Sequence, residues 1–87
     1  MNTWVWKVSP PAERDIRRLD RPVRQRIFDA LDRFTTTYPH GDVVRLQGID
    51  PPEYRLRVGD WRVRFRPDLV SNTIFVLRVL PRGEAYR

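Results

Sequence analysis

The stretch Glu53-Tyr54-Arg55-Leu56-Arg57-Val58-Gly59-Asp60-Trp61-Arg62-Val63-Arg64-Phe65-Arg66 decides the fold. Apolar and basic residues alternate on both sides of Gly59-Asp60, a pattern typical of two strands joined by a two-residue turn. Successive strand residues point to opposite faces, so one face is apolar and the other is basic. The apolar face holds Tyr54, Leu56, Val58, Trp61, Val63 and Phe65. The basic face, called the arginine face below, holds Arg55, Arg57, Arg62, Arg64 and Arg66.

The arginine face predicts an anionic partner. A Gly59-Asp60 loop places Arg57 opposite Arg62 and Arg55 opposite Arg64, and like charges directly opposed destabilise a sheet by up to roughly 1 kcal/mol per pair. None of the five outward positions from Arg55 to Arg66 is acidic. A polyanion lying across the face would compensate, because guanidinium groups bind phosphate oxygens in a bidentate manner. The alternative is an ordinary solvated face that is rich in Arg because the whole chain uses Arg in preference to Lys. Of its 17 basic residues, 16 are Arg.

Length and composition limit the class of protein. A chain of 87 residues predicts one domain over residues 1–87, and its net charge of +6 favours acidic partners. No apolar run approaches the ~20 residues of a membrane span, and the N-terminus lacks the pattern of an export signal. With no cysteine, the chain has no disulfide and no thiolate chemistry. We therefore expect a cytoplasmic protein that does not associate with membranes.

The rest of the sequence predicts the other elements of an α+β domain. A β-prone run covers residues 3–8, and Ser9 followed by prolines indicates a helix over residues 10–19. Asp20 caps a second helix with an apolar stripe, and we expect residues 35–42 to end this helix and form a loop. Residues 43–46 form a short strand or lead into one, and the apolar run 73–80 predicts a central strand covered on both faces. The expected fold is an N-terminal strand, an antiparallel two-helix hairpin and then a three- to four-stranded antiparallel sheet, with the helices packed on one sheet face.

Few side chains are suited to catalysis. The one histidine, His40, lies in a Pro/Gly loop, and no residues have metal-ligand spacing, so we expect neither metal nor cofactor. What remains is a cluster of guanidinium groups and the phenol of Tyr86, which could donate a proton or stack on a base. Guanidinium groups are poor general bases, but they stabilise charge that develops on a phosphodiester. RNA carries its own nucleophile, the 2′-hydroxyl, so electrostatics and positioning could suffice for an RNase.

Two segments, Tyr54–Val63 (YRLRVGDWRV) and Leu77–Arg87 (LRVLPRGEAYR), resemble the RelE/ParE superfamily of bacterial toxins, as do the shorter segments Ala12–Leu19 and Arg45–Gly48. The resemblance covers almost the whole chain and implies a RelE-like, microbial-RNase-like fold and a toxin of a type II toxin–antitoxin system. The RelE branch cleaves mRNA in the ribosomal A site without metal, whereas the ParE branch inhibits DNA gyrase and is not a nuclease. We expect the first activity, with gyrase inhibition and a purely binding protein as alternatives.

The resemblance also implies site residues and partners. Residues compatible with the RelE catalytic pattern are Arg55, Arg57, Arg62, Arg82 and Tyr86, and further RNA contacts are expected from Arg45, Arg64, Arg66 and Arg78. Two departures concern proton transfer: some RelE toxins have Lys in the strand of Arg55 and Arg57, and many relatives have Gly-His where Leu80-Pro81 stands here. The implied partners are the ribosome with its mRNA, or gyrase in the alternative, and a cognate antitoxin. We expect the antitoxin to cover the arginine face or to displace the segment of Tyr86.

Overall fold

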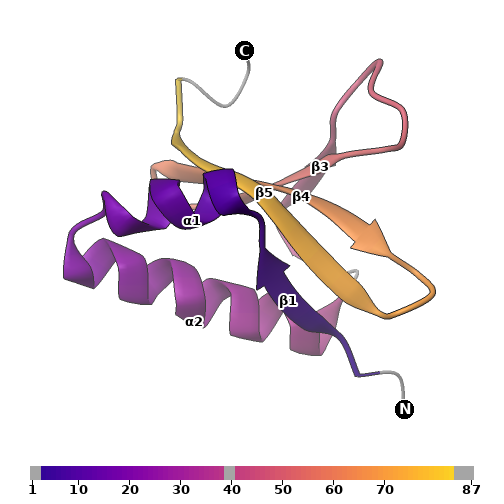
Figure 1. Cartoon of the computed structure of the whole chain (residues 1–87), viewed down its shortest axis with the longest axis horizontal. Coiled ribbons are helices and arrows are strands. Elements are labelled where there is room, and N and C mark those ends of the chain that lie inside the picture. The colour runs from indigo at the N-terminus through magenta and orange to yellow at the C-terminus, as the bar shows by residue number, and fades with distance from the viewer. Residues whose placement is uncertain (1–2, 39–40, 84–87) are drawn as a thin grey trace.

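The computed structural model describes residues 3–38 and 41–83, which form two helices and one five-stranded sheet (Figure 1). The elements are β1 (Val5–Val8), α1 (Pro10–Arg17), α2 (Arg21–Thr37), β2 (Val43–Arg45), β3 (Tyr54–Val58), β4 (Trp61–Asp68) and β5 (Thr73–Pro81). The strand order is β1-β5-β4-β3-β2, and every neighbouring pair is antiparallel except β1 with β5. The predicted α+β class is confirmed. The sheet has more strands than expected because β1 joins it in parallel beside the last strand.

The central hairpin has the register that the alternation predicts. Val58 pairs with Trp61, so Gly59 and Asp60 form the two-residue loop. Gly59 adopts a φ of 59°, which glycine adopts without the steric cost of a Cβ atom and which a tight hairpin requires at this position. The arginines oppose one another as expected, Arg57 with Arg62 and Arg55 with Arg64.

The start of α1 has a side-chain cap, whereas Asp20, the N-cap residue of α2, makes no side-chain capping bond. The Ala12 amide donates to Ser9 Oγ at 3.3 Å, which confirms Ser9 as the N-cap of α1. The expected loop at residues 35–37 is wrong, because all three threonines are helical and α2 ends at Thr37. Their hydroxyl groups donate to the carbonyls of Leu31, Asp32 and Arg33 one turn earlier. These bonds give the threonine hydroxyl groups hydrogen-bond partners inside the helix, so the three residues can be helical.

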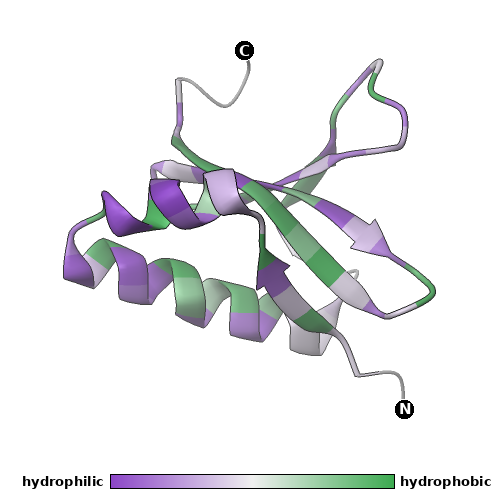
Figure 2. Ribbon diagram, viewed as in Figure 1, coloured by the Kyte–Doolittle hydropathy of each residue, from purple (hydrophilic) through white to green (hydrophobic). Residues whose placement is uncertain are grey.

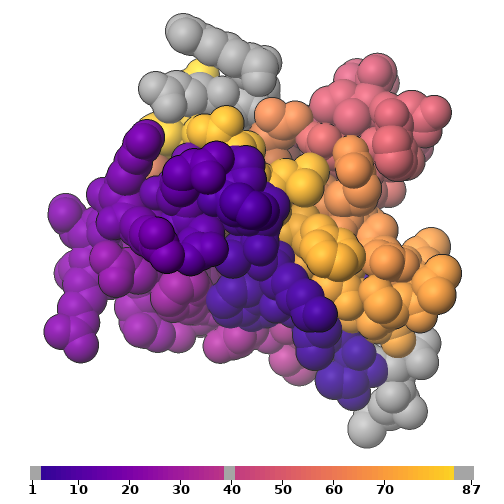
Figure 3. All heavy atoms as spheres, viewed as in Figure 1, coloured from indigo at the N-terminus to yellow at the C-terminus, as the bar shows by residue number. Residues whose placement is uncertain are grey.

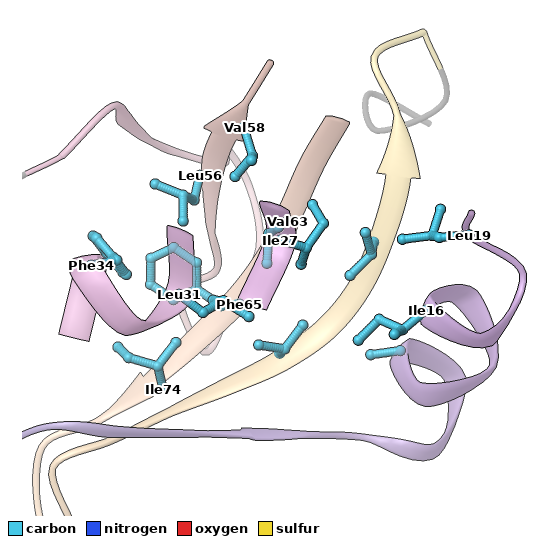
Figure 4. Close-up of a cluster of buried hydrophobic side chains, with 13 residues drawn as sticks. Ile16, Leu19, Ile27, Leu31, Phe34, Leu56, Val58, Val63, Phe65 and Ile74 are labelled. Atoms are coloured by element: carbon cyan, nitrogen blue, oxygen red, sulfur yellow. The ribbon is translucent and has the colours of Figure 1, made fainter. Parts of the chain in front are cut away.

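The core lies between the helices and one face of the sheet. Side chains from α1, α2 and the strands point toward one another around Phe65 (Figure 4). Phe65 is fully buried, with its ring 5.2 Å from that of Phe34 and 5.7 Å from that of Tyr54. Hydrophobic and hydrophilic residues alternate along α2, so one side of this helix faces the core (Figure 2). Neither described helix is long and apolar enough to cross a membrane.

The strand β5 is covered on one face only, so the expectation of two covered faces is wrong. Ile74 and Val76 are fully buried, whereas Phe75 between them is 38% exposed. Both helices pack on the face of Ile74 and Val76, and no described element covers the other face. The apolar run therefore reflects one buried face and a partly exposed aromatic residue, not a sandwiched strand.

Helix α1 closes the edge of β5 beyond the end of β1. The Asp15 carboxylate accepts a bond of 2.9 Å from the Val79 amide, and it accepts two bonds from the Arg78 guanidinium at 2.8 and 3.2 Å. The side chains of α1 lie against those of β5 in the space-filling view (Figure 3). The Asp15 side chain is only 10% exposed, although Asp15 lies among the charged residues of α1. The aspartate satisfies an amide that would otherwise lie at an open sheet edge.

The β4–β5 turn supplies a pH-dependent contribution to stability. The Asp68 carboxylate accepts from the Val70 and Ser71 amides at 2.9 and 3.3 Å, and these bonds hold the pKa of Asp68 below its ordinary value of 3.8. A lowered folded-state pKa stabilises the fold above the unfolded value, and this contribution is lost as the pH falls through the folded value.

We therefore expect the Asp68→Asn variant to lose less unfolding free energy than the wild type when the pH is lowered below 3.8. Chemical denaturation of both proteins across this range measures the difference. Parallel pH profiles would contradict a role for the Asp68 charge.

Candidate nucleic-acid interface

The arginine face lies on the side of the sheet that the helices leave uncovered. Its positions alternate with core positions such as Leu56, Val63 and Phe65, which are buried against the helices. Pairing across three strands places Arg55, Arg64 and Arg78 in one row. The sheet therefore brings together guanidinium groups from β3, β4 and β5.

Glu53 supplies the acid that the arginine face was expected to lack. It precedes β3 by one residue, is 9% exposed and points to the arginine face. One carboxylate oxygen accepts from Arg64 Nη2 at 2.6 Å and the other accepts from Arg66 Nη2 at 3.2 Å. The Nε atoms of Arg64 and Arg66 are buried without a hydrogen-bond partner. Both guanidinium groups are thus turned inward onto one carboxylate.

Arg62 is a structural part of the hairpin turn. It is 7% exposed, and its Nη1 atom donates to the carbonyls of Gly59 and Trp61 at 2.8 and 2.9 Å. The Nη1 atom of Arg62 is thus engaged inside the protein. The place of Arg62 in the catalytic set therefore stays a prediction, and its observed contacts hold the loop shape that positions its neighbours.

Two exposed cations of the predicted catalytic set lie at the turn end of the sheet. The Arg57 side chain is 62% exposed, and its Nη1 atom is 3.5 Å from a carboxylate oxygen of the equally exposed Asp42. Arg82 is exposed, and its backbone amide donates to the Asp60 carbonyl at 2.9 Å, which fixes it beside the turn. Arg57 and the end of β5 are separated by β4, a distance of about 10 Å for two strand spacings. The partly buried Arg55 lies next to Arg57 on the same face.

The other predicted site residues fall into two groups. Arg78, half-exposed, is engaged by Asp15. Arg45 pairs with Tyr54 at the β2 edge, so it lies on the helix side of the sheet and is not brought together with the arginine face. Tyr86 and His40 lie outside the described residues.

Sequence reasoning missed two acidic residues that bind predicted site residues, Glu53 and Asp15. Only the position of Glu53 could have been inferred from the sequence. Glu53 has the same strand parity as Arg55, so its position on the arginine face could have been inferred from the alternation. Asp15 could not, because its contact with β5 spans more than sixty positions of chain and depends on how α1 closes the sheet edge.

The open cations can bind and stabilise anionic groups. Arginine stays protonated and offers several donors, so Arg57 and Arg82 can hold phosphate oxygens and stabilise developing negative charge. Within residues 3–38 and 41–83, no three His, Cys, Asp or Glu side chains gather as a metal site would require. The described part of the interface is therefore an electrostatic surface.

Known proteins share this fold and this sequence pattern. The family model described as the ParE toxin of the type II toxin–antitoxin system parDE matches residues 6–86. No curated protein sequence matches the chain significantly.

Three solved structures illustrate the likeness in fold. A chain of the archaeal RelE–RelB complex from Pyrococcus horikoshii is 24% identical, with a TM-score of 0.75, over 95% of this chain and 99% of that one. A chain of the RelBE2 toxin–antitoxin complex from Mycobacterium tuberculosis is 19% identical, with a TM-score of 0.80, over 93% and 100%. The isolated RelE toxin of E. coli is 18% identical, with a TM-score of 0.74, over 95% and 90%. At these identities the structures show the fold, and the family model, which spans nearly the whole chain, shows the kinship. The chain belongs to the ParE toxin family of type II toxin–antitoxin systems, within the RelE/ParE superfamily.

Proposed function

We propose that this toxin is a metal-independent endoribonuclease that cleaves mRNA on the ribosome. The observation that carries the proposal is the pair of open cations, Arg57 and Arg82, on either side of the Gly59-Asp60 turn. Both lie at the end of an uncovered sheet face in a chain of net charge +6. Such a surface suits a phosphodiester, whose oxygens accept charge-assisted hydrogen bonds from guanidinium groups.

The proposed chemistry is an internal transesterification. The 2′-oxygen of the RNA attacks the adjacent phosphorus, the bond from phosphorus to the 5′-oxygen breaks, and the products carry a 2′,3′-cyclic phosphate and a 5′-hydroxyl. Arg57 and Arg82 stabilise the negative charge that grows on the phosphoryl oxygens, with Arg55 beside them. The 2′-hydroxyl proton leaves to solvent, because a guanidinium is a poor base. Tyr86 is proposed to protonate the leaving 5′-oxygen.

Inhibition of DNA gyrase is the second candidate. It is favoured by the family model, which is that of the ParE toxins. It is also favoured by the internal contacts of Arg62, Arg64 and Arg66, which leave fewer cations open to RNA than the sequence pattern implies. A non-nuclease toxin would use the same sheet face as a protein-binding surface.

We propose a small antitoxin as the partner in either case. Three solved chains of the same fold come from complexes of RelE with RelB. An acidic or amphipathic segment would complement the arginine face, or it would displace the segment of Tyr86. A structure of the complex in which both regions stay open would contradict this placement.

Expression in cells distinguishes the two activities. Induction of the wild type without antitoxin is expected to arrest growth and to produce in-frame cuts in mapped transcripts. The Arg57→Ala, Arg82→Ala double variant should lose both effects. The matched control, Arg17→Ala with Arg21→Ala, removes two exposed arginines from the helices and should keep both. Arrest with intact transcripts and DNA damage would favour gyrase, and harmless expression would favour a purely binding protein.

A further inference from the structure

We propose that Glu53 is an internal anion that takes the place of a phosphate between Arg64 and Arg66, and so confines RNA to the turn end of the arginine face. This inference rests on the proposed binding of RNA. Glu53 would set how much of the arginine face RNA can contact. Arg64 and Arg66 would then be withheld from the ligand, although the sequence pattern counts them among the RNA contacts.

The geometry of the Glu53 carboxylate is that of a bridging ligand. Its two oxygens each accept from a different guanidinium, at 2.6 Å from Arg64 and 3.2 Å from Arg66. A phosphodiester offers the same arrangement of two non-bridging oxygens and one negative charge. The carboxylate is therefore a chemical and geometric substitute for a backbone phosphate at this point.

Burial makes the substitute hard to displace. The Glu53 side chain is 11% exposed and that of Arg64 is 20% exposed, whereas the open cation Arg57 is 62% exposed. The Glu53 carbonyl also accepts from the Leu46 amide at 2.9 Å, so its backbone is anchored to the end of β2. A phosphate that replaced the carboxylate would have to expel a buried charge from both of its partners, which is costly.

The contrast with Asp42 shows that the two acids near the face act differently. Asp42 is 62% exposed and 3.5 Å from Arg57, and exposed pairs of this kind contribute little and exchange readily with other anions. A phosphate can thus take Arg57 from Asp42, but it does not take Arg64 and Arg66 from Glu53. The exposed cations left for the footprint are Arg57 and Arg82.

The salt dependence of RNA binding tests the inference, because its slope reports how many phosphates are neutralised. The test variant is Glu53→Gln, which keeps the shape of the side chain and removes its charge. The control is Asp29→Asn, which changes the net charge by the same amount at an exposed position of α2. The probe is a short single-stranded oligouridine. Release of two guanidinium groups should steepen the slope of log K against log salt by about 1.4 in Glu53→Gln. Asp29→Asn should keep the wild-type slope. A Glu53→Gln slope equal to or shallower than that of the wild type would overturn the inference.

Two further measurements test the role of Glu53. The first does not require that the protein binds RNA, and the second does not require that the variant folds. Elution from heparin, a polyanion without bases, should require more salt for Glu53→Gln than for Asp29→Asn even if the wild type binds no RNA. If the wild type binds no RNA but Glu53→Gln elutes at higher salt, the proposed RNA function is contradicted and the role of Glu53 as an internal anion is supported. In the wild type, RNA should shift the Nε–Hε NMR signals of Arg57 and Arg82 and leave those of Arg64 and Arg66 in place. Equal shifts in all four would overturn the inference without any variant.

Discussion

The Phe65→Ala variant is expected to lose about 3–5 kcal/mol of unfolding free energy, the usual cost of removing a buried phenyl ring. Phe65 is fully buried in the centre of the sheet and contacts the rings of Phe34 and Tyr54. Its loss would leave a cavity that the helices and β4 line together. In a domain of this size the loss should lower the Tm by at least ~12 °C.

The matched control is Phe75→Ala on the neighbouring strand. Phe75 is 38% exposed on the uncovered face, so the same substitution removes less buried surface and leaves no enclosed cavity. We expect a cost of about 1 kcal/mol. Urea denaturation of both variants measures the difference, and equal losses would mean that the core is not where the burial places it.

The Asp15→Ala variant should destabilise the fold by about 2–3 kcal/mol, although the residue lies on a mostly charged helix. The substitution leaves the Val79 amide without its acceptor and removes the partner of Arg78. The partly exposed Arg78 can turn to water, so the orphaned amide accounts for most of the loss.

Glu13→Ala on the same helix is the control for this prediction. Glu13 pairs only with the exposed Arg17, and both side chains are more than half exposed. Its loss should cost about 0.5 kcal/mol or less. A similar small loss for Asp15→Ala would show that the edge of β5 does not need the aspartate.

Local alternation predicted the centre of this fold, and long-range packing determined the rest. The register from Tyr54 to Phe65, the Ser9 cap and the apolar stripe of α2 were all readable, because each depends on neighbours in sequence. The family resemblance was readable for the same reason and is confirmed. The parallel pairing of β1 with β5 was not, since it joins segments nearly seventy positions apart.

The candidate site was only partly predictable. Alternation placed the arginines on one face, but it does not reveal which guanidinium groups are satisfied internally. Arg62 turns back onto the loop carbonyls, and Glu53 binds Arg64 and Arg66. These are choices of side-chain conformation and burial, which depend on the twist and the loops around the sheet. They make Arg57 and Arg82 a better pair to substitute than Arg62, whose loss would also disturb the turn.

Cleavage of a defined mRNA by the purified chain, in the presence of programmed ribosomes, tests the proposed activity most directly. The wild type should cut within the codon in the A site and leave a 2′,3′-cyclic phosphate and a 5′-hydroxyl. The Arg57→Ala, Arg82→Ala variant should be slower by at least ~10²-fold, the loss expected when transition-state charge is no longer stabilised. The Arg17→Ala, Arg21→Ala control should cut at the wild-type rate. Intact mRNA with the wild type, together with inhibition of purified gyrase, would contradict the RNase and establish the alternative.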